Sequence, residues 1–174
     1  MKLLTKITVV FVIFGAFLIS SCLKPAEFPN EPKIEFVSFE AQGDSSGIFV
    51  ISFTDGDGDI GLDIGDTLIP YEPGSYYYYN VYFDYYEIVN GDTVRGTSDP
   101  NNFPTADPIT LAFRIKNITP IGQNKALKGE VRITLEPRYY HLGATSNDSI
   151  LYKIVLIDRA LNISNELITP IITR

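Results

Sequence analysis

The sequence predicts an all-β protein: one antiparallel β-sandwich of seven or eight strands, placed after an N-terminal signal peptide. Three observations lead to this prediction. Tyr and Phe occur 11 times each, and together with Ile, Val and Thr they favour strands over helices. From residue 33 onward, short alternating or wholly apolar runs are separated by clusters of Gly, Pro, Asn and Asp. The same region shows no helical period, and its length suits a single domain.

The first 21 residues have the features of a secretory signal peptide. Lys2 and Lys6 provide a basic start, and residues 7–19 contain only one polar side chain, that of Thr8. This apolar run is too short for a membrane-spanning helix, which needs about 20 residues. A buried N-terminal core helix is the alternative. Because residues 1–21 contain two lysines and no acid, their removal changes the net charge from −7 to −9.

The end of this run, Ile19-Ser20-Ser21-Cys22, resembles the lipobox of bacterial lipoproteins, in which the cysteine becomes the acylated first residue of the mature chain. The alternative is an ordinary secretory signal followed by a cysteine that is not modified. Two or more acyl chains anchor a protein stably in a bilayer, so we expect Cys22 to tether the chain to a membrane. As the single cysteine, it also excludes an intramolecular disulfide and a CxxC-type zinc or redox site.

Residues 22–32 are predicted to be the lipidated cysteine and a linker. Three prolines in this stretch disfavour a helix, so the linker is expected to be extended and to hold the domain roughly 30 Å from the bilayer. Leu23 rather than Asp follows the cysteine. By resemblance to the lipoproteins of diderm bacteria, this residue directs the protein to the outer membrane, on either its periplasmic or its surface face.

Residues 33–174 are predicted to be the single β domain. Asn90-Gly91 separates two strand-like runs, which indicates a type I′ hairpin because both residues tolerate positive φ. Pro170 removes a ladder donor and so predicts an edge position for the last strand. This number of strands without a helix is typical of immunoglobulin-like, cadherin-like or fibronectin-like sandwiches, with a small barrel as the alternative. The predicted strands are 33–41, 46–54, 76–90, 92–96, 109–118, 129–136, 149–158 and 166–173.

The loop after the second predicted strand carries five acids between residues 55 and 66, without Lys or Arg. These carboxylates repel one another unless they are splayed into water or gathered around a cation. Hard Ca²⁺ takes six to eight oxygen ligands, and alternating Asp residues on a Gly-rich loop can supply them. A solvated acidic turn is the alternative, since Asp and Gly are common in turns. The predicted structural Ca²⁺ ligands are Asp55, Asp57, Asp59, the carbonyl of Gly61, Asp63 and Asp66.

If Asp55 is taken as position 1 of a twelve-residue EF-hand calcium loop, Ile60 falls at position 6, where that loop needs glycine. Since no helices are expected to flank the segment either, an EF-hand is excluded. Leu62 falls where an aliphatic side chain usually packs into the core. Asp158 and Asn162, in the loop before the last strand, are additional candidate ligands if both loops lie at one end of the sandwich. If residues 92–96 form a fully paired strand, the number of reversals of chain direction between the two loops changes by one. The two loops are then expected to lie at opposite ends of the sandwich.

Tyrosines crowd the predicted 76–90 strand. Strict alternation predicts a core face with Tyr77, Tyr79 and Tyr85. The other face is expected to be a partly exposed aromatic stripe suited to sugar stacking or protein contacts, although cross-strand packing on a covered sheet is the commoner role. The stripe consists of Tyr76, Tyr78, Tyr82 and Tyr86.

Composition argues against two classes of function. The acidic balance disfavours nucleic-acid partners, since their binding is driven by clustered Lys and Arg. One histidine, His141, and no nucleophile at a suggestive spacing leave no predicted catalytic residue, so the protein is not expected to be an enzyme. The alternative of a glycosidase carboxylate pair is weaker than an ion site for so dense a cluster.

Three stretches, residues 53–61, 117–130 and 157–165, together with the lipobox resemble uncharacterised lipoproteins of Bacteroidota. The resemblance spans most of the mature chain and implies no particular activity. We therefore expect a non-catalytic outer-membrane lipoprotein whose Ca²⁺-stabilised sandwich contacts another envelope protein as an adhesion or accessory module. The alternative is a surface lipoprotein that binds glycans through the tyrosine stripe.

Overall fold

The computed structural model describes residues 27–99, 106–122, 125–140 and 149–173. The predicted signal peptide, the lipobox-like segment with Cys22, and His141 lie outside the described residues. Within them, no helix has both the length and the apolar character that crossing a membrane requires.

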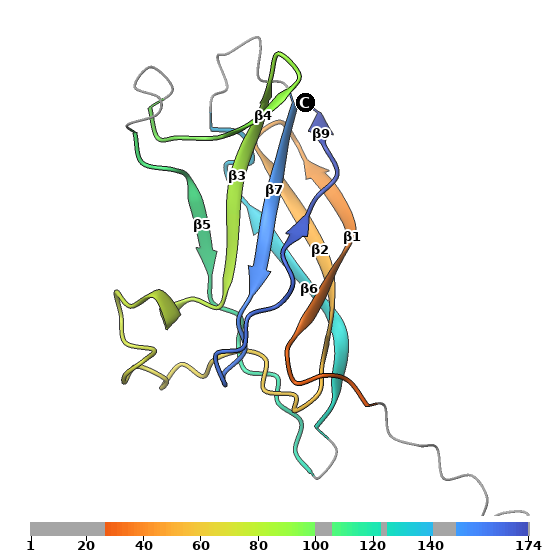
Figure 1. Cartoon of the computed structure of the whole chain (residues 1–174), viewed down its shortest axis with the longest axis vertical. Helices are drawn as coiled ribbons and strands as arrows, with labels where there is room; N and C mark the ends of the chain where they lie inside the picture. Colours follow the sequence, from red (N-terminus) through yellow and green to blue (C-terminus); the bar gives the residue numbers. More distant parts are fainter. Residues whose placement is uncertain (1–26, 100–105, 123–124, 141–148, 174) are drawn as a thin grey trace, which may run out of the picture.

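Two antiparallel sheets pack face to face as a β-sandwich, which confirms the predicted all-β class (Figure 1). The first sheet has the order β1-β2-β6, formed by β1 (Lys33–Gln42), β2 (Ser46–Asp55) and β6 (Leu127–Leu135). The second sheet is built on the central pair β3 (Val81–Val89) and β7 (Ser149–Leu156).

The outer edges of the second sheet each carry two short strands in succession. Strands β4 (Asp92–Arg95) and β5 (Thr110–Phe113) both pair with β3. On the far side, β8 (Leu167–Ile168) and β9 (Ile172–Thr173) both pair with β7. The predicted 166–173 strand is thus split, with Pro170 between its halves at the sheet edge, where its missing donor does not interrupt a central ladder.

The strand start at residue 76 was predicted wrongly. Tyr76–Tyr78 form a short 3-10 helix, and β3 begins only at Val81. High β-propensity is overridden here because the chain turns through this segment before it enters the sheet. The hairpin prediction is confirmed, since Asn90 (φ 54°) and Gly91 (φ 91°) both have positive φ between β3 and β4.

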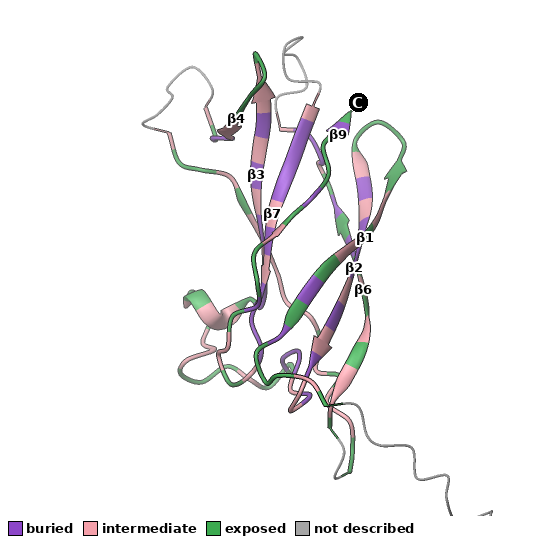
Figure 2. Ribbon diagram, turned by 45° about the vertical axis from the view of Figure 1, so that its right-hand side comes forward, coloured by how far each residue is buried: buried purple, intermediate pink, exposed green. Residues whose placement is uncertain are grey.

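The core lies between the two sheets and is made of the inward-facing residues of both. Phe49 of β2 packs edge-to-face against Phe83 of β3 and Tyr152 of β7, with ring centroids 5.5 and 5.3 Å apart. Buried residues line most of β7 (Figure 2). This two-sided packing holds the central strands β2 and β7 in fixed positions at the ends where both leave the sandwich.

Both of those ends lie at the same end of the molecule (Figure 1). Strands β4 and β5 are both antiparallel to β3, so they run in the same direction. Together they reverse the direction of the chain only once. The expectation that a paired 92–96 strand would put the two candidate loops at opposite ends is therefore wrong. The loop after β2 and the loop after β7 are neighbours.

Candidate metal centre

Two core-facing series of side chains end in an aspartate. On β2, Phe49, Ile51 and Phe53 point into the core, and the next inward position is Asp55, which is 0% exposed. On β7 the inward series ends at Leu156. The next inward-facing position, two residues later, is Asp158, which is 2% exposed. Because the two strands belong to opposite sheets, the sandwich directs both carboxylates toward the same end of its core.

Asp57 and Asp59 join these two residues in one cluster. Each of the four aspartates offers a carboxylate oxygen, and these oxygens all lie within 4.8 Å of one another. Ligand oxygens of Ca²⁺ lie about 2.3–2.6 Å from the ion, so oxygens on opposite sides of it are about 5 Å apart. The spacing of the cluster therefore fits one shared Ca²⁺ ion.

The cluster is short of positive partners. The Oδ1 atoms of Asp55, Asp57 and Asp59 are buried without a hydrogen-bond partner, and within the described part of the chain none of the four aspartates forms an ion pair. Asp55 Oδ2 accepts a single bond, from the backbone N–H of Asp59 at 2.9 Å. Buried carboxylate oxygens without donors are costly, and a bound cation removes that cost.

Burial and mutual repulsion raise the pKa values in this cluster. Burial, followed by the charge of Asp57, raises the pKa of Asp55 to about 7. Burial also raises the pKa of Asp59 and of Asp158, against the lowering effect of backbone N–H groups on Asp59 and of Asn162 on Asp158. Without a cation, the site thus holds protons at a pH where ordinary aspartates have lost them.

We expect the ion-free protein to lose stability as the pH rises from about 5 to about 8. The folded pKa of Asp55 is about 7 against an ordinary 3.8, so in this interval the folded state binds more protons than the unfolded state, and the free energy of unfolding falls. Urea unfolding in chelator measures this slope. Asp55→Asn should flatten it, and an equally steep slope in that variant would contradict the assignment.

Glycines between the aspartates let other backbone segments approach the loop. Gly56 donates its N–H to the carbonyl of Pro29 at 2.8 Å, so the segment before β1 is fastened to the loop. Gly58 has a φ of +66°, and a Cβ there would overlap the carbonyl oxygen of Lys125. The Asp-Gly alternation thus faces carboxylates inward while the glycines accommodate the surrounding chain.

Asn162 holds Asp158 in place. Its backbone N–H donates to Asp158 Oδ1 and its side-chain amide donates to Oδ2, both at 2.8 Å. These two bonds orient the Asp158 carboxylate and leave lone pairs on both oxygens for a metal. The structure therefore brings Asp158 into the cluster and places Asn162 behind it.

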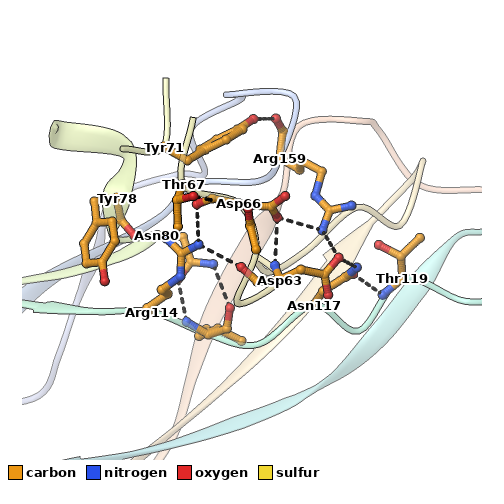
Figure 3. A network of polar contacts seen from close by, with 12 residues as sticks. Asp63, Asp66, Thr67, Tyr71, Tyr78, Asn80, Arg114, Asn117, Thr119 and Arg159 are labelled. Atoms are coloured by element: carbon orange, nitrogen blue, oxygen red, sulfur yellow. Dashed lines mark hydrogen bonds and ion pairs between the residues drawn. The ribbon is translucent and has the colours of Figure 1, made fainter. Parts of the chain in front are cut away.

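Asp63 and Asp66 are not brought to the other aspartates. Their Oδ2 atoms pair with Arg159, at 3.1 and 3.2 Å, and Asp63 also accepts a bond from Asn117 at 2.9 Å (Figure 3). The hydrogen bond from Asn117, followed by Arg159, lowers the pKa of Asp63, since both partners stabilise its charged form. These contacts fasten the residue that follows Asp158, so the two acids support the site from outside the cluster.

Arg114 completes this support, which the sequence did not predict. Its guanidinium donates to the carbonyls of Asp63 and Asp66, at 2.9 and 2.8 Å, and to that of Tyr78 (Figure 3). The predicted 109–118 strand includes Arg114, but β5 ends at Phe113, one residue before it. The local signal for its role was weak, because its acceptors are backbone carbonyls of a distant loop.

The backbone of this loop does not turn where an EF-hand calcium loop that starts at Asp55 would turn. Ile60 is completely buried in the core, and the positive φ values lie at Gly58 and Gly61 on either side of it. Gly61 packs closely against the backbone of Lys116, which explains the glycine there. Leu62 is buried as predicted. The loop turns at two glycines rather than one, and this directs Asp63 away from Asp59.

The tyrosine stripe is largely engaged by its neighbours. Tyr76 stacks on Tyr82 with ring centroids 4.8 Å apart and an interplanar angle of 5°. Arg114 lies over the ring of Tyr78, and both Arg95 and Lys153 lie over that of Tyr86. On the predicted core face, Tyr85 is buried, whereas Tyr79 is exposed because it precedes the strand.

Comparison of this chain with protein-family models, with curated proteins and with solved structures found no match.

Proposed function

We propose that the protein is a Ca²⁺-stabilised β-sandwich module, tethered to the outer membrane through acylated Cys22, with a non-catalytic role in contacting another envelope protein. The observation that carries the calcium assignment is the cluster of Asp55, Asp57, Asp59 and Asp158, with three buried carboxylate oxygens that lack a partner. Carboxylate-only sites suit hard Ca²⁺, whereas zinc prefers His or Cys ligands. The tether is supported by the lipobox-like Ile19-Ser20-Ser21-Cys22.

The strand order supports an immunoglobulin-like or fibronectin-like subclass of the sandwich. The first, second and sixth strands form one sheet, and the third and seventh are the centre of the other. Glycan binding through the tyrosine stripe gains no support, since neighbouring residues lie over or against the rings that a sugar would stack on. An adhesion or accessory role remains the better proposal.

Thermal unfolding with Ca²⁺ or with chelator tests the calcium assignment. Ligand that binds only the folded state adds about 2.7 kcal/mol at a concentration 100 times its Kd. For a domain of this size, we expect the melting midpoint to rise by roughly 5–10 °C. Mg²⁺ at the same concentration is the matched control and should act less, because it prefers fewer protein ligands. An unchanged midpoint in Ca²⁺ would refute the assignment.

A further inference from the structure

Exposed aliphatic side chains gather at the end of the sandwich that carries the metal cluster. They lie on three loops, at residues 62–72, 117–122 and 159–163, and Ile64 is 98% exposed. Isolated exposed aliphatics are common, but several on adjoining loops mark a surface that contacts a partner. This surface, called here the apolar loop face, consists of Ile64, Leu68, Ile69, Ile118, Ile121 and Ile163.

Hydrogen bonds join the three loops into one platform. The backbone N–H of Asn117 donates to the carbonyl of Leu62, and Arg159 pairs with Asp63 and Asp66 (Figure 3). Tyr71 donates its hydroxyl to the carbonyl of Arg159. Polar groups thus tie the loops together, while the six aliphatic side chains on them are between 41% and 104% exposed.

Two described turns at the opposite end of the sandwich differ from this face. Gly43-Asp44-Ser45 and Asn90-Gly91-Asp92 contain none of the large exposed apolar side chains. These two turns therefore offer no apolar surface to a partner.

The tether leads from the apolar end. The carbonyl of Pro29 is hydrogen-bonded to Gly56 in the metal loop, so the chain is fastened to the domain there. Six residues lie between Cys22 and Pro29, so the two are seven residue steps apart in the chain and at most about 25 Å apart in space. The ten-residue strands β1 and β2 place the other end about 33 Å further away. An acylated Cys22 therefore keeps the apolar loop face within about 25 Å of the bilayer, and a linker that is not fully extended, contrary to the expectation from its prolines, lets the face reach it.

We infer that the apolar loop face rests on the surface of the membrane that holds Cys22, with its aliphatic side chains in the interfacial layer. This inference rests on the proposed lipid tether. The partner is a lipid surface because the tether holds this face, and not the opposite end of the sandwich, within reach of one. Ca²⁺ bound to the four carboxylates behind the face also lowers their repulsion from anionic headgroups.

The chain contains no tryptophan, so a single introduced tryptophan reports its own surroundings. Full-length acylated protein is reconstituted in vesicles of phosphatidylethanolamine and phosphatidylglycerol in the presence of Ca²⁺. The probe is Ile64→Trp, with Ile121→Trp as a second position on the face. The control is Ile171→Trp, 57% exposed beside β9 and outside the face. We expect blue-shifted emission and at least two-fold stronger quenching by brominated lipids for the probes than for the control.

Each other outcome overturns the inference in a recognisable way. Probe and control tryptophans that both emit as in water show that the face does not touch lipid. A blue shift without quenching by brominated lipid shows that a protein, such as a second copy of this chain, covers the face instead. Mass spectrometry of Cys22 separates the two proposals: acylated protein with water-exposed probes overturns this inference alone, whereas an unmodified Cys22 overturns the tether as well.

Discussion

Asp55→Asn is expected to make the protein more stable in chelator and to abolish most of the stabilisation by Ca²⁺. Asn keeps the size of Asp55 but removes a charge that is completely buried and lies against Asp57, Asp59 and Asp158. Its amide group also supplies a donor to oxygens that have none. In chelator near pH 8 the gain should be about 1–3 kcal/mol, the usual cost of an unsatisfied buried polar group.

In saturating Ca²⁺ the order of stability should be reversed. The wild type gains binding free energy, and the variant lacks one carboxylate of the coordinating group, so its melting midpoint should fall below that of the wild type. Few other mechanisms make one substitution stabilising in chelator and destabilising in calcium. Thermal unfolding of both proteins under both conditions measures the reversal.

Asp63→Asn is the matched control for this experiment. Asp63 belongs to the same acidic loop, but its carboxylate contacts Arg159 and Asn117 on the surface. Exposed pairs contribute little, so the variant should lose less than about 1 kcal/mol and keep the full calcium shift. Loss of the calcium shift in Asp63→Asn would show that the ligand set is the one expected from calcium-loop spacing, and not the cluster with Asp158.

Gly58→Ala is expected to lower the free energy of unfolding by more than about 2 kcal/mol and to weaken calcium binding. An alanine at φ +66° costs about 1–2 kcal/mol from backbone sterics alone. The added methyl group also overlaps the carbonyl oxygen of Lys125, which belongs to the backbone and cannot rotate away. Since Asp57 and Asp59 flank this residue, any shift of the loop separates their oxygens.

Two other glycines separate these contributions. Gly91 has a φ of +91° but open space around its Cβ position, so Gly91→Ala reports the cost of the dihedral angle alone. Gly65 has open space and no positive φ, and Gly65→Ala should change stability by no more than about 0.5 kcal/mol. Urea unfolding and calcium titration of the three variants give the comparison. Equal losses for Gly58→Ala and Gly91→Ala would contradict the close approach of Lys125.

Three features of the protein meet at one end of the sandwich. The four-carboxylate cluster, the attachment of Pro29 to Gly56, and the apolar loop face lie on the segment before β1 and on the loops after β2, between β5 and β6, and after β7. Calcium would order the loop to which the tether segment is bonded. Metal binding, anchoring and orientation on the membrane are thus coupled through the same few residues in this proposal.

Three members of the four-aspartate cluster could be predicted from local spacing. Alternation on a Gly-rich segment was enough to select Asp55, Asp57 and Asp59, because neighbouring carboxylates on one turn must share their surroundings. The same reasoning also selected Asp63 and Asp66, which the structure places elsewhere. A pattern of acids does not show where the chain bends, and here two glycines with positive φ and the attraction of Arg159 decide it.

The sequence of β2 carries a signal for a buried charged site. The period-two series Phe49, Ile51, Phe53 continues directly into Asp55, and an acid in a core-facing position requires a partner. The series on β7 leads in the same way to Asp158. Read together, these two series indicate a buried charged site between the sheets rather than a surface calcium loop.

The sequence alone predicted the approximate positions of the strands, the Asn90-Gly91 hairpin and the edge position of Pro170, because side-chain alternation and φ preferences are local properties. It did not predict the start of β3 at Val81 or the end of β5 at Phe113. Tertiary structure alone decided which carboxylates meet. Asp55 and Asp158 come from opposite sheets and from distant parts of the chain, and only the packing of β2 against β7 brings them together. Strand parity, which depends on β4 and β5 sharing one edge of β3, is likewise a property of the folded molecule.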